Sequence, residues 1–373
     1  MKKIKKPKLS TWVLLFVFAL CPVLNIVAWK SESFCNWYTQ NIFPVWTNLY
    51  GRLTSLVPFS FGEMLIAVAL VGIPLSLILL IVLLITKRGK RKKVLRVYGF
   101  TYLWIIAFVA LTETLNCFIL YHCSSFAKLN DIPERQHTVS QLEQLAEELI
   151  TKTNELAVKV NRDDKGQFVL TADLNDTAKK AMQNLGDEFP SLKGYYVTPK
   201  AVKSSYFMSQ QYLMGIYFPF SMEANYNRLM YPSNLPDTVC HELAHTKGFI
   251  REDEASFIAF LACSRSDNTE YQYSGYLNAL KYVLDKVSEN SADEKQQSLV
   301  DMISGEVAAD IVGNSSYWQT VQEEDKGLIS SKTVAEVSDK AMEASLKLNG
   351  VEDGKKSYGR MVDLLLNYYY DCA

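Results

Sequence analysis

Two histidines and a glutamate within five consecutive residues form the segment of this sequence with the clearest chemical meaning. The segment reads His241-Glu242-Leu243-Ala244-His245. Residues four apart share a face of an α-helix, so the two imidazoles can converge on one metal ion. Glu242 would then point at the open coordination position and take a proton from water. Because the chain has only four histidines, the spacing is uncommon by chance. The pattern predicts a Zn²⁺ site with His241 and His245 as ligands and Glu242 as catalytic base.

A third ligand is expected in the helix that follows. After Gly248 the chain reads FIREDEASFIAFLAC, an acidic start followed by a strongly apolar run. Glu254 lies on the apolar stripe of this helix, so its carboxylate would reach the buried interface with the first helix, where it is costly unless paired or metal-bound. Glu254 is therefore our first choice as third ligand, and Glu252 is the second. If Glu252 and Asp253 are not metal ligands, the preference for acidic residues at a helix N-terminus explains them. One of them could also orient a ligand histidine.

Local signals favour a helix across the histidine pair. Asn234 can cap it, and Pro236 and Asp237 suit its first turn. Gly248 lies where a left-handed stop would fall. The alternative interpretation is a solvated or core helix face that carries the pattern by accident.

The residues after about 138 are expected to be mainly helical around one extended segment. Ser140 and Glu143 have the spacing of a capping box. Residues 195–225 are rich in Tyr and Phe, and Pro219 within residues 215–220 indicates an edge strand, where one missing donor is tolerated. Further helices are predicted over residues 175–185, 276–287, 290–304, 306–312, 332–348 and 357–370.

Three apolar stretches near the N-terminus are long enough to cross a bilayer, which takes about 20 residues of helix. They cover approximately residues 10–29, 61–86 and 97–121. Lys and Arg gather before the first stretch and between the second and third, and such clusters mark the cytoplasmic side. We therefore expect a multi-pass protein of the cell membrane with a cytoplasmic N-terminus and the lipid bilayer as a partner. The predicted fold class is membrane-anchored and mainly α (α+β), with an anchor over residues 1–122 and a helix-rich extracytoplasmic domain with a small sheet over residues 123–373.

The composition argues against several other classes. Hydrophobic residues make up 49% of the chain and the net charge is −1, which excludes a mostly disordered protein and gives no electrostatic reason to expect a nucleic-acid partner. The chain has no Gly-rich phosphate loop and no CxxC spacing, and Cys240 and Cys263 are expected to fill core space. The HELAH segment lies in mixed polar sequence, which disfavours an intramembrane protease. The sequence does not indicate an oligomeric state.

The motif and its surroundings resemble known families. HELAH, a short turn and the run EASFIA resemble the short-spaced, Glu-ligated zincin metallopeptidases, which implies a zincin-like domain with Glu254 as third zinc ligand. Ser256 stands where those enzymes usually have Asn or Asp supporting the site. The three apolar stretches, the segments GIYFPFSMEAN and CHELAHTKGFIREDEASFIAFLAC, and KSYGRMVDLLLNYYY near the end are similar to an uncharacterised family of bacterial membrane proteins of unknown function, which implies no particular substrate.

The peptidase resemblance also implies how a substrate would be held. Zincins bind peptides by strand addition at an edge strand upstream of the motif, so Gly215, Ile216, Tyr217 and Asn225 are candidate substrate contacts, with an ordinary buried strand as the alternative. An oxyanion-stabilising donor is also expected. The candidates for that donor are Tyr271, Tyr273, Tyr276 and Arg360. The function predicted is a membrane-tethered zinc metallopeptidase that hydrolyses peptide bonds outside the cytoplasm. The alternative is a non-catalytic scaffold or sensor that binds a peptide or protein.

Overall fold

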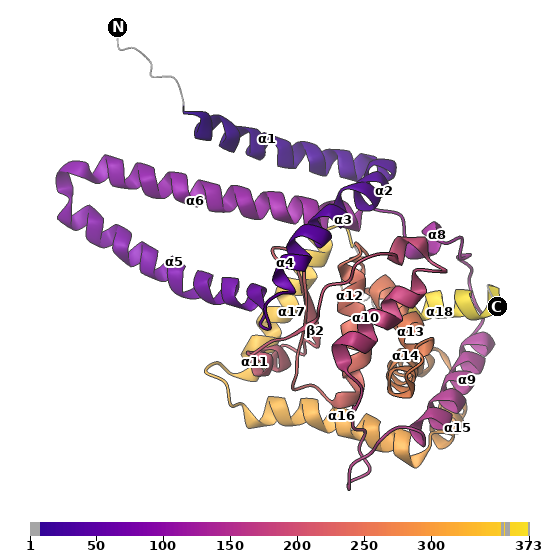
Figure 1. The fold of residues 1–373 in the computed structure, drawn as a ribbon. Helices are drawn as coiled ribbons and strands as arrows, with labels where there is room; N and C mark the ends of the chain where they lie inside the picture. Colours follow the sequence, from indigo (N-terminus) through magenta and orange to yellow (C-terminus); the bar gives the residue numbers. More distant parts are fainter. Residues whose placement is uncertain (1–7, 352–353, 355–358, 372–373) are drawn as a thin grey trace.

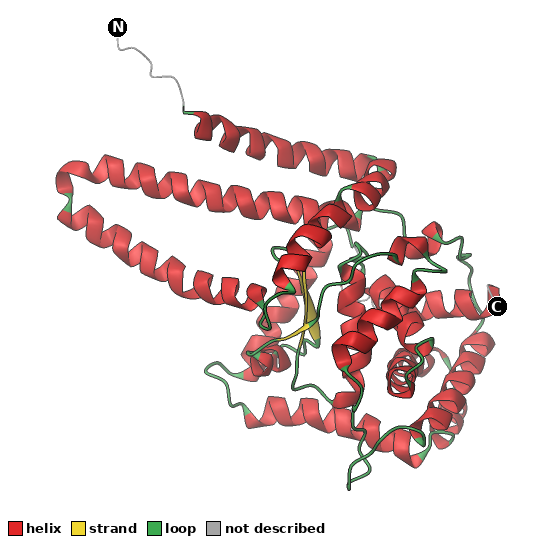
Figure 2. Cartoon of the chain, in the orientation of Figure 1, coloured by secondary structure: helices red, strands yellow, loops and turns green. Residues whose placement is uncertain are grey.

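The computed structural model describes residues 8–351, 354 and 359–371, and most of these residues are helical. Three long helices extend from one side of a helical body (Figure 1). A small sheet lies in that body, close to the long helices (Figure 2). The predicted mainly helical fold with three apolar membrane helices and a small sheet is therefore confirmed.

The long helices coincide with the three apolar stretches. They are α1 (Leu9–Lys30), α5 (Phe61–Thr86) and a third run made of η2 (Arg88–Lys90), α6 (Arg91–Glu113), η3 (Thr114–Phe118) and α7 (Ile119–Tyr121). Helix α6 contacts both α1 and α5. Gly62 is the only buried residue of α5, so its Leu, Ile and Val side chains are exposed along the whole helix. Such a surface would be unfavourable in water and is typical of a helix surrounded by lipid.

An amphipathic connector of short helices joins the first long helix to the second. It consists of α2 (Glu32–Asn41), α3 (Phe43–Trp46), η1 (Thr47–Gly51) and α4 (Arg52–Thr54). Phe43, Thr47 and Gly51 are buried on the face toward the helical body, where the Thr47 hydroxyl donates to the Thr246 carbonyl oxygen at 3.1 Å. The opposite face carries exposed apolar side chains, among them Val45, Leu49, Leu53 and Leu56.

The helical body is built around α12 (Leu235–His245), α13 (Glu252–Ser264) and α14 (Thr269–Asn290). Helix α13 contacts both α12 and α14, while α9 (Val139–Ala157) contacts α14 and α10 (Leu174–Leu185) contacts α12. The remaining helices and turns are α8 (Phe126–Leu129), η4 (Pro190–Leu192), α11 (Ser205–Gln210), η5 (Pro232–Asn234), α15 (Asp293–Asp301), α16 (Gly305–Glu324), α17 (Ser331–Leu348) and α18 (Arg360–Asp371).

Some predicted boundaries differ from the structure. The capping box of α9 is formed by Thr138 and Gln141 rather than Ser140 and Glu143, because the helix begins one residue earlier than Ser140. Helix α16 continues twelve residues beyond the predicted end at Val312. The start predicted for the last helix, Ser357, lies outside the described residues.

The sheet has the strand order β1-β3-β2. Strand β1 (Lys200–Ala201) is parallel to β3 (Glu223–Tyr226), and β2 (Gly215–Phe218) is antiparallel to β3. The register pairs Gly215 with Tyr226 and Phe218 with Glu223. The predicted edge strand is therefore confirmed, and Pro219 lies just beyond its end.

Candidate metal centre

Helix α12 carries the histidine pair, and its ends explain its position. Pro236 occupies the first turn and Gly248 adopts a left-handed φ of 97° shortly after the helix ends, as the sequence predicts. Asn234 occupies the N-cap position, but its side chain does not cap the helix. Instead it donates to Asn314 Oδ1 at 2.7 Å and accepts from Lys281 Nζ at 3.0 Å. The cap position is therefore right and its predicted hydrogen bond is wrong.

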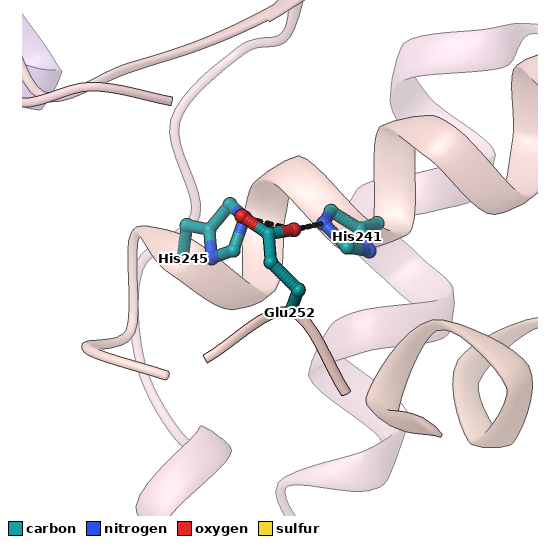
Figure 3. Close-up of side chains that lie close together, drawn as sticks. All are labelled: His241, His245 and Glu252. Carbon is teal, nitrogen blue, oxygen red and sulfur yellow. Dashed lines mark hydrogen bonds and ion pairs between the residues drawn. The ribbon is translucent and has the colours of Figure 1, made fainter. Parts of the chain in front are cut away.

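The two histidines meet a carboxylate from the first residue of α13. His241 Nε2 lies 3.0 Å from Glu252 Oε2, and His245 Nε2 lies 3.8 Å from the same oxygen. Figure 3 shows the Glu252 carboxylate between the two imidazoles. One nitrogen from each ring and one carboxylate oxygen lie within 4.8 Å of one another, so the three residues could hold a metal ion.

The other ring nitrogens are engaged by neighbouring groups. His245 Nδ1 lies 2.8 Å from the Phe249 carbonyl oxygen, which can only accept a hydrogen bond, so Nδ1 carries the hydrogen. His241 Nδ1 lies 3.2 Å from Ser256 Oγ. These contacts orient both rings with Nε2 toward Glu252, which is the usual support of a metal-bound histidine. Ser256 thus occupies the supporting position that the sequence resemblance suggests.

The charge state of the cluster follows from burial and from Glu252. Burial lowers the pKa of His245 to about 4, so this imidazole is neutral at neutral pH, as metal binding requires. Burial opposes protonation of His241 as well, but the hydrogen bond and charge of Glu252 raise the pKa of His241 to about 9. A metal ion would therefore displace a proton from His241.

Glu242 is a buried carboxylate without a hydrogen-bond partner at one oxygen. Burial raises the pKa of Glu242 to about 8, with Glu252 adding to the effect and His241 opposing it. Within the described part of the chain, Glu242 Oε2 is buried and makes no hydrogen bond. Leaving such an atom unpaired is costly unless a ligand or cation satisfies it. The donor set and this oxygen together fit a divalent cation such as zinc.

The edge strand runs directly against this carboxylate. A Cβ atom at Gly215 would lie 2.3 Å from Glu242 Oε1 and 2.6 Å from Glu242 Cγ, closer than real Cβ contacts. Gly215 is therefore the residue that lets strand β2 approach Glu242. The Tyr217 ring centroid is 6.2 Å from that of His245.

Asp253 and Glu254, the two acidic residues after Glu252, do not belong to the histidine cluster. Glu254 Oε1 pairs with Arg251 at 3.2 Å, and Asp253 Oδ2 accepts from Arg360 Nε at 2.8 Å. Both line a separate cavity of about 940 Å³. Burial raises the pKa of Glu254 to about 7 without bringing it to the histidines. The expectation that Glu254 joins the histidine pair is thus corrected, since Glu252 occupies that place, and Asp253 orients neither histidine.

A cavity of about 770 Å³ surrounds the cluster. Its walls include Gly215, Ile216 and Tyr217, the expected substrate contacts on β2. Asn225 does not line it, because this side chain is buried in the central strand and donates to the Ile216 carbonyl oxygen at 3.4 Å. Helix α17 and the end of the third long helix complete the cavity.

Sequence reasoning missed a tyrosine in this cavity. Tyr271, Tyr273, Tyr276 and Arg360, the expected oxyanion donors, do not line it. Tyr282 of α14 does line it. No pattern in the sequence separates Tyr282 from the other tyrosines of α14, since its place in the cavity depends on how α14 packs beside α13.

The comparisons place most of the chain in one family. A family profile described as "Protein of unknown function (DUF3810)" matches residues 38–366. No curated protein and no solved structure matches the chain.

Proposed function

The chain belongs to the family described as a protein of unknown function (DUF3810), and from the geometry of its site we propose that it is a membrane-anchored, zinc-dependent metallopeptidase. The observation that carries the proposal is the Glu242 carboxylate. It is buried, is unpartnered at Oε2 within the described residues, lies against an edge strand, and lines the same cavity as His241, His245 and Glu252. A structural helix face has no need of an unsatisfied buried carboxylate.

Each residue of the site has a chemical role in this proposal. His241, His245 and Glu252 would hold the zinc ion, which when bound lowers the pKa of water and polarises the peptide carbonyl. Glu242 accepts the proton of the attacking water, whose oxygen bonds to the carbonyl carbon. Glu242 then donates that proton to the amide nitrogen as the C–N bond breaks, leaving a carboxylic acid and an amine. Tyr282, the α14 residue that lines the cavity, would donate to the developing oxyanion.

The edge strand supports a peptide as the substrate. β2 pairs with β3 on one side only, so its other edge can pair with an added strand. Gly215, Ile216 and Tyr217 of this strand line the same cavity as Glu242. A peptide aligned on β2 would therefore pass the base.

The basic clusters support an extracytoplasmic site. The turn between α5 and α6 and the start of α6 carry Lys and Arg at residues 87–96, at the end of the helices remote from the helical body (Figure 1). In this proposal the basic end is cytoplasmic, as the positive-inside rule favours, and the helical body would then lie outside the cytoplasm.

A non-catalytic peptide receptor is the second candidate. Helix α17 favours it, because Ser338, Met342 and Leu346 of this helix form part of the cavity wall and could hold a bound peptide in place. Turnover separates the two candidates, whereas zinc content does not.

The test of the proposal is hydrolysis of a peptide library by the full-length protein in detergent or vesicles. We expect zinc-dependent cleavage by the wild type and a loss of roughly 10²-fold or more in Glu242→Gln, with zinc content unchanged, because only the base is removed. Glu306→Gln, the same change on the exposed start of α16, should cleave like the wild type. Equal cleavage by Glu242→Gln would refute the assignment of the base, and a wild type without turnover would favour the receptor.

A further inference from the structure

The hairpin that contains the edge strand is fastened to the ends of the membrane helices. The Glu223 carboxylate accepts hydrogen bonds from the first backbone amides of α5, Phe61 N at 3.0 Å and Gly62 N at 2.7 Å. On the other side, the Asn116 amide of η3 donates to the Pro219 carbonyl oxygen at 2.8 Å. The β2–β3 hairpin is therefore held between the second and third long helices.

The tip of this hairpin reaches along the apolar part of the third helix. The Phe220 ring centroid lies 6.0 Å from that of Phe108. Phe108 precedes Asn116 by eight residues, which is about 12 Å along a helix. The tip therefore lies beside the apolar stretch of the third long helix, farther from the helical body than the point where Asn116 contacts Pro219.

The connector marks the level of the bilayer surface. Its exposed face carries Val45, Leu49 and Leu53, while Thr47 and Gly51 face the helical body. A helix that exposes apolar side chains on one face and packs its other face against the protein is expected to lie in the membrane interface. Its apolar face then points toward the acyl chains. Figure 1 shows α3 and α4 crossing the boundary between the long helices and the helical body.

The site cavity is built partly from membrane helix. Glu113, Cys117 and Tyr121, at four-residue intervals on the third long helix, line the same cavity as His241 and Glu242. Strand β2 starts at Gly215 beside Glu242 and ends at Phe218, whose ring lies against Gly62 of α5. Four residues of strand span roughly 13 Å, so the base lies within about one strand length of the membrane helices.

We infer that the substrates are peptide segments that adjoin a membrane anchor, and that they are cut within a few residues of the bilayer surface. This inference rests on the proposed peptidase function. A peptide paired along β2 has one end at Phe218 and the hairpin tip, where an attached transmembrane helix or lipid chain enters the bilayer. The bond cleaved is a peptide C–N bond of the anchored segment, and water is the co-reactant, as in the proposed peptidase reaction.

The test uses full-length protein reconstituted with zinc in vesicles of phosphatidylcholine and phosphatidylglycerol. Three peptide pools share one randomised segment. In the first the segment is joined directly to an apolar transmembrane helix at either end, in the second a flexible Gly-Ser linker separates the two, and the third lacks the helix. Mass spectrometry gives the rate and the position of cleavage, and Glu242→Gln supplies the background.

We expect the directly anchored pool to be cut roughly tenfold or more faster than the soluble pool because of its higher effective concentration. The cuts should lie within about eight residues of the anchor, from the length of β2 plus the headgroup layer. The linker pool is equally concentrated, so it controls for tethering alone and should not be cut in its randomised segment at this rate.

Each other outcome overturns the inference in a distinguishable way. If cleavage depends on Glu242 but the soluble and linker pools are cut as well as the anchored pool, the peptidase stands and the membrane-proximal substrate is wrong. If no pool is cut by the zinc-loaded wild type, both the peptidase and the inference fail.

A second measurement does not depend on activity. A photoreactive benzoylphenylalanine introduced at Phe220 should cross-link to phospholipid, whereas the same group at Val312, exposed on α16, should not. Equal labelling at both positions, or none at Phe220, would contradict the placement of the hairpin tip.

Discussion

At the scale of single residues, the site depends on how closely a strand approaches a carboxylate. Gly215 leaves room for Glu242, whose Oε1 lies where a Cβ would need space. The same carboxylate has its pKa raised to about 8 by burial, so it is a stronger base than an exposed glutamate. The approach of β2 and the raised pKa thus both concern the Glu242 carboxylate.

We predict that Gly215→Ala lowers hydrolysis by about 10- to 100-fold, because a displacement of the base by about 1 Å is enough for such a loss. Zinc content should stay at the wild-type level, since the three atoms nearest to an added Cβ all belong to Glu242 and not to a residue of the histidine cluster. The control is Gly305→Ala at the start of α16, where an added Cβ meets nothing within 4 Å. Unchanged hydrolysis in Gly215→Ala would show that the strand does not limit the base.

The sequence identifies His241, Glu242 and His245 from spacing alone, but it does not identify the acid beside them. The choice of Glu254 assumed that the apolar stripe of α13 faces α12. In the structure every residue of α13 from Asp253 to Cys263 is buried, so the helix is surrounded on all sides and has no single facing stripe. Glu252 and Glu254 lie about 200° apart around a helix, and only the packing of α13 decides which one faces the histidines.

At the scale of elements, the buried Glu270 carboxylate joins the loop before α10 to the start of α14. Glu270 in the first turn of α14 accepts from the backbone amides of Thr171 and Ala172 at 2.9 and 2.8 Å and from Asn161 at 3.0 Å. Burial alone would raise the pKa of Glu270, but these hydrogen bonds and that of the Thr171 hydroxyl lower it below the ordinary value.

A lowered pKa in the folded state makes this contribution to stability depend on pH. The contribution is fully present above the ordinary value of 4.5 and is lost as the pH falls through the folded pKa of Glu270. We predict that Glu270→Gln costs about 1.5–3 kcal/mol at pH 7, the usual range for hydrogen bonds to a charged group, and that the difference from wild type shrinks below pH 4.5. Thermal unfolding in detergent between pH 3 and 7 measures it, with Glu294→Gln on exposed α15 as control. A difference that stays constant with pH would contradict this account.

At the scale of the whole molecule, the sequence predicts the membrane helices well and the cavity poorly. Hydropathy gives the first two long helices within one residue at each end and the end of the third, because lipid imposes a length of about 20 apolar residues. It misses the start of the third, because α6 begins at Arg91 in the basic segment before the apolar stretch. The cavity combines α12, β2, α17 and the end of the third long helix, which are far apart in the chain. Such long-range packing leaves no periodic signal in the sequence.

The proposed orientation of the whole molecule rests on its basic residues and can be measured with reporter fusions. We predict that alkaline phosphatase is active when fused after residue 371 and inactive when fused after residue 90, because the basic turn is retained in the cytoplasm. A cytoplasmic reporter such as green fluorescent protein should give the reverse pattern. Phosphatase activity at residue 90 alone would invert the topology and place the site in the cytoplasm.

The central claim is that His241, His245 and Glu252 form a metal centre, and zinc content of the purified full-length protein tests it most directly. We expect about one zinc per chain in the wild type and in Glu254→Ala, and a loss of most of the zinc in Glu252→Ala, because three protein ligands are the usual set of a catalytic zinc site. Zinc retained in Glu252→Ala and lost in Glu254→Ala would contradict the account.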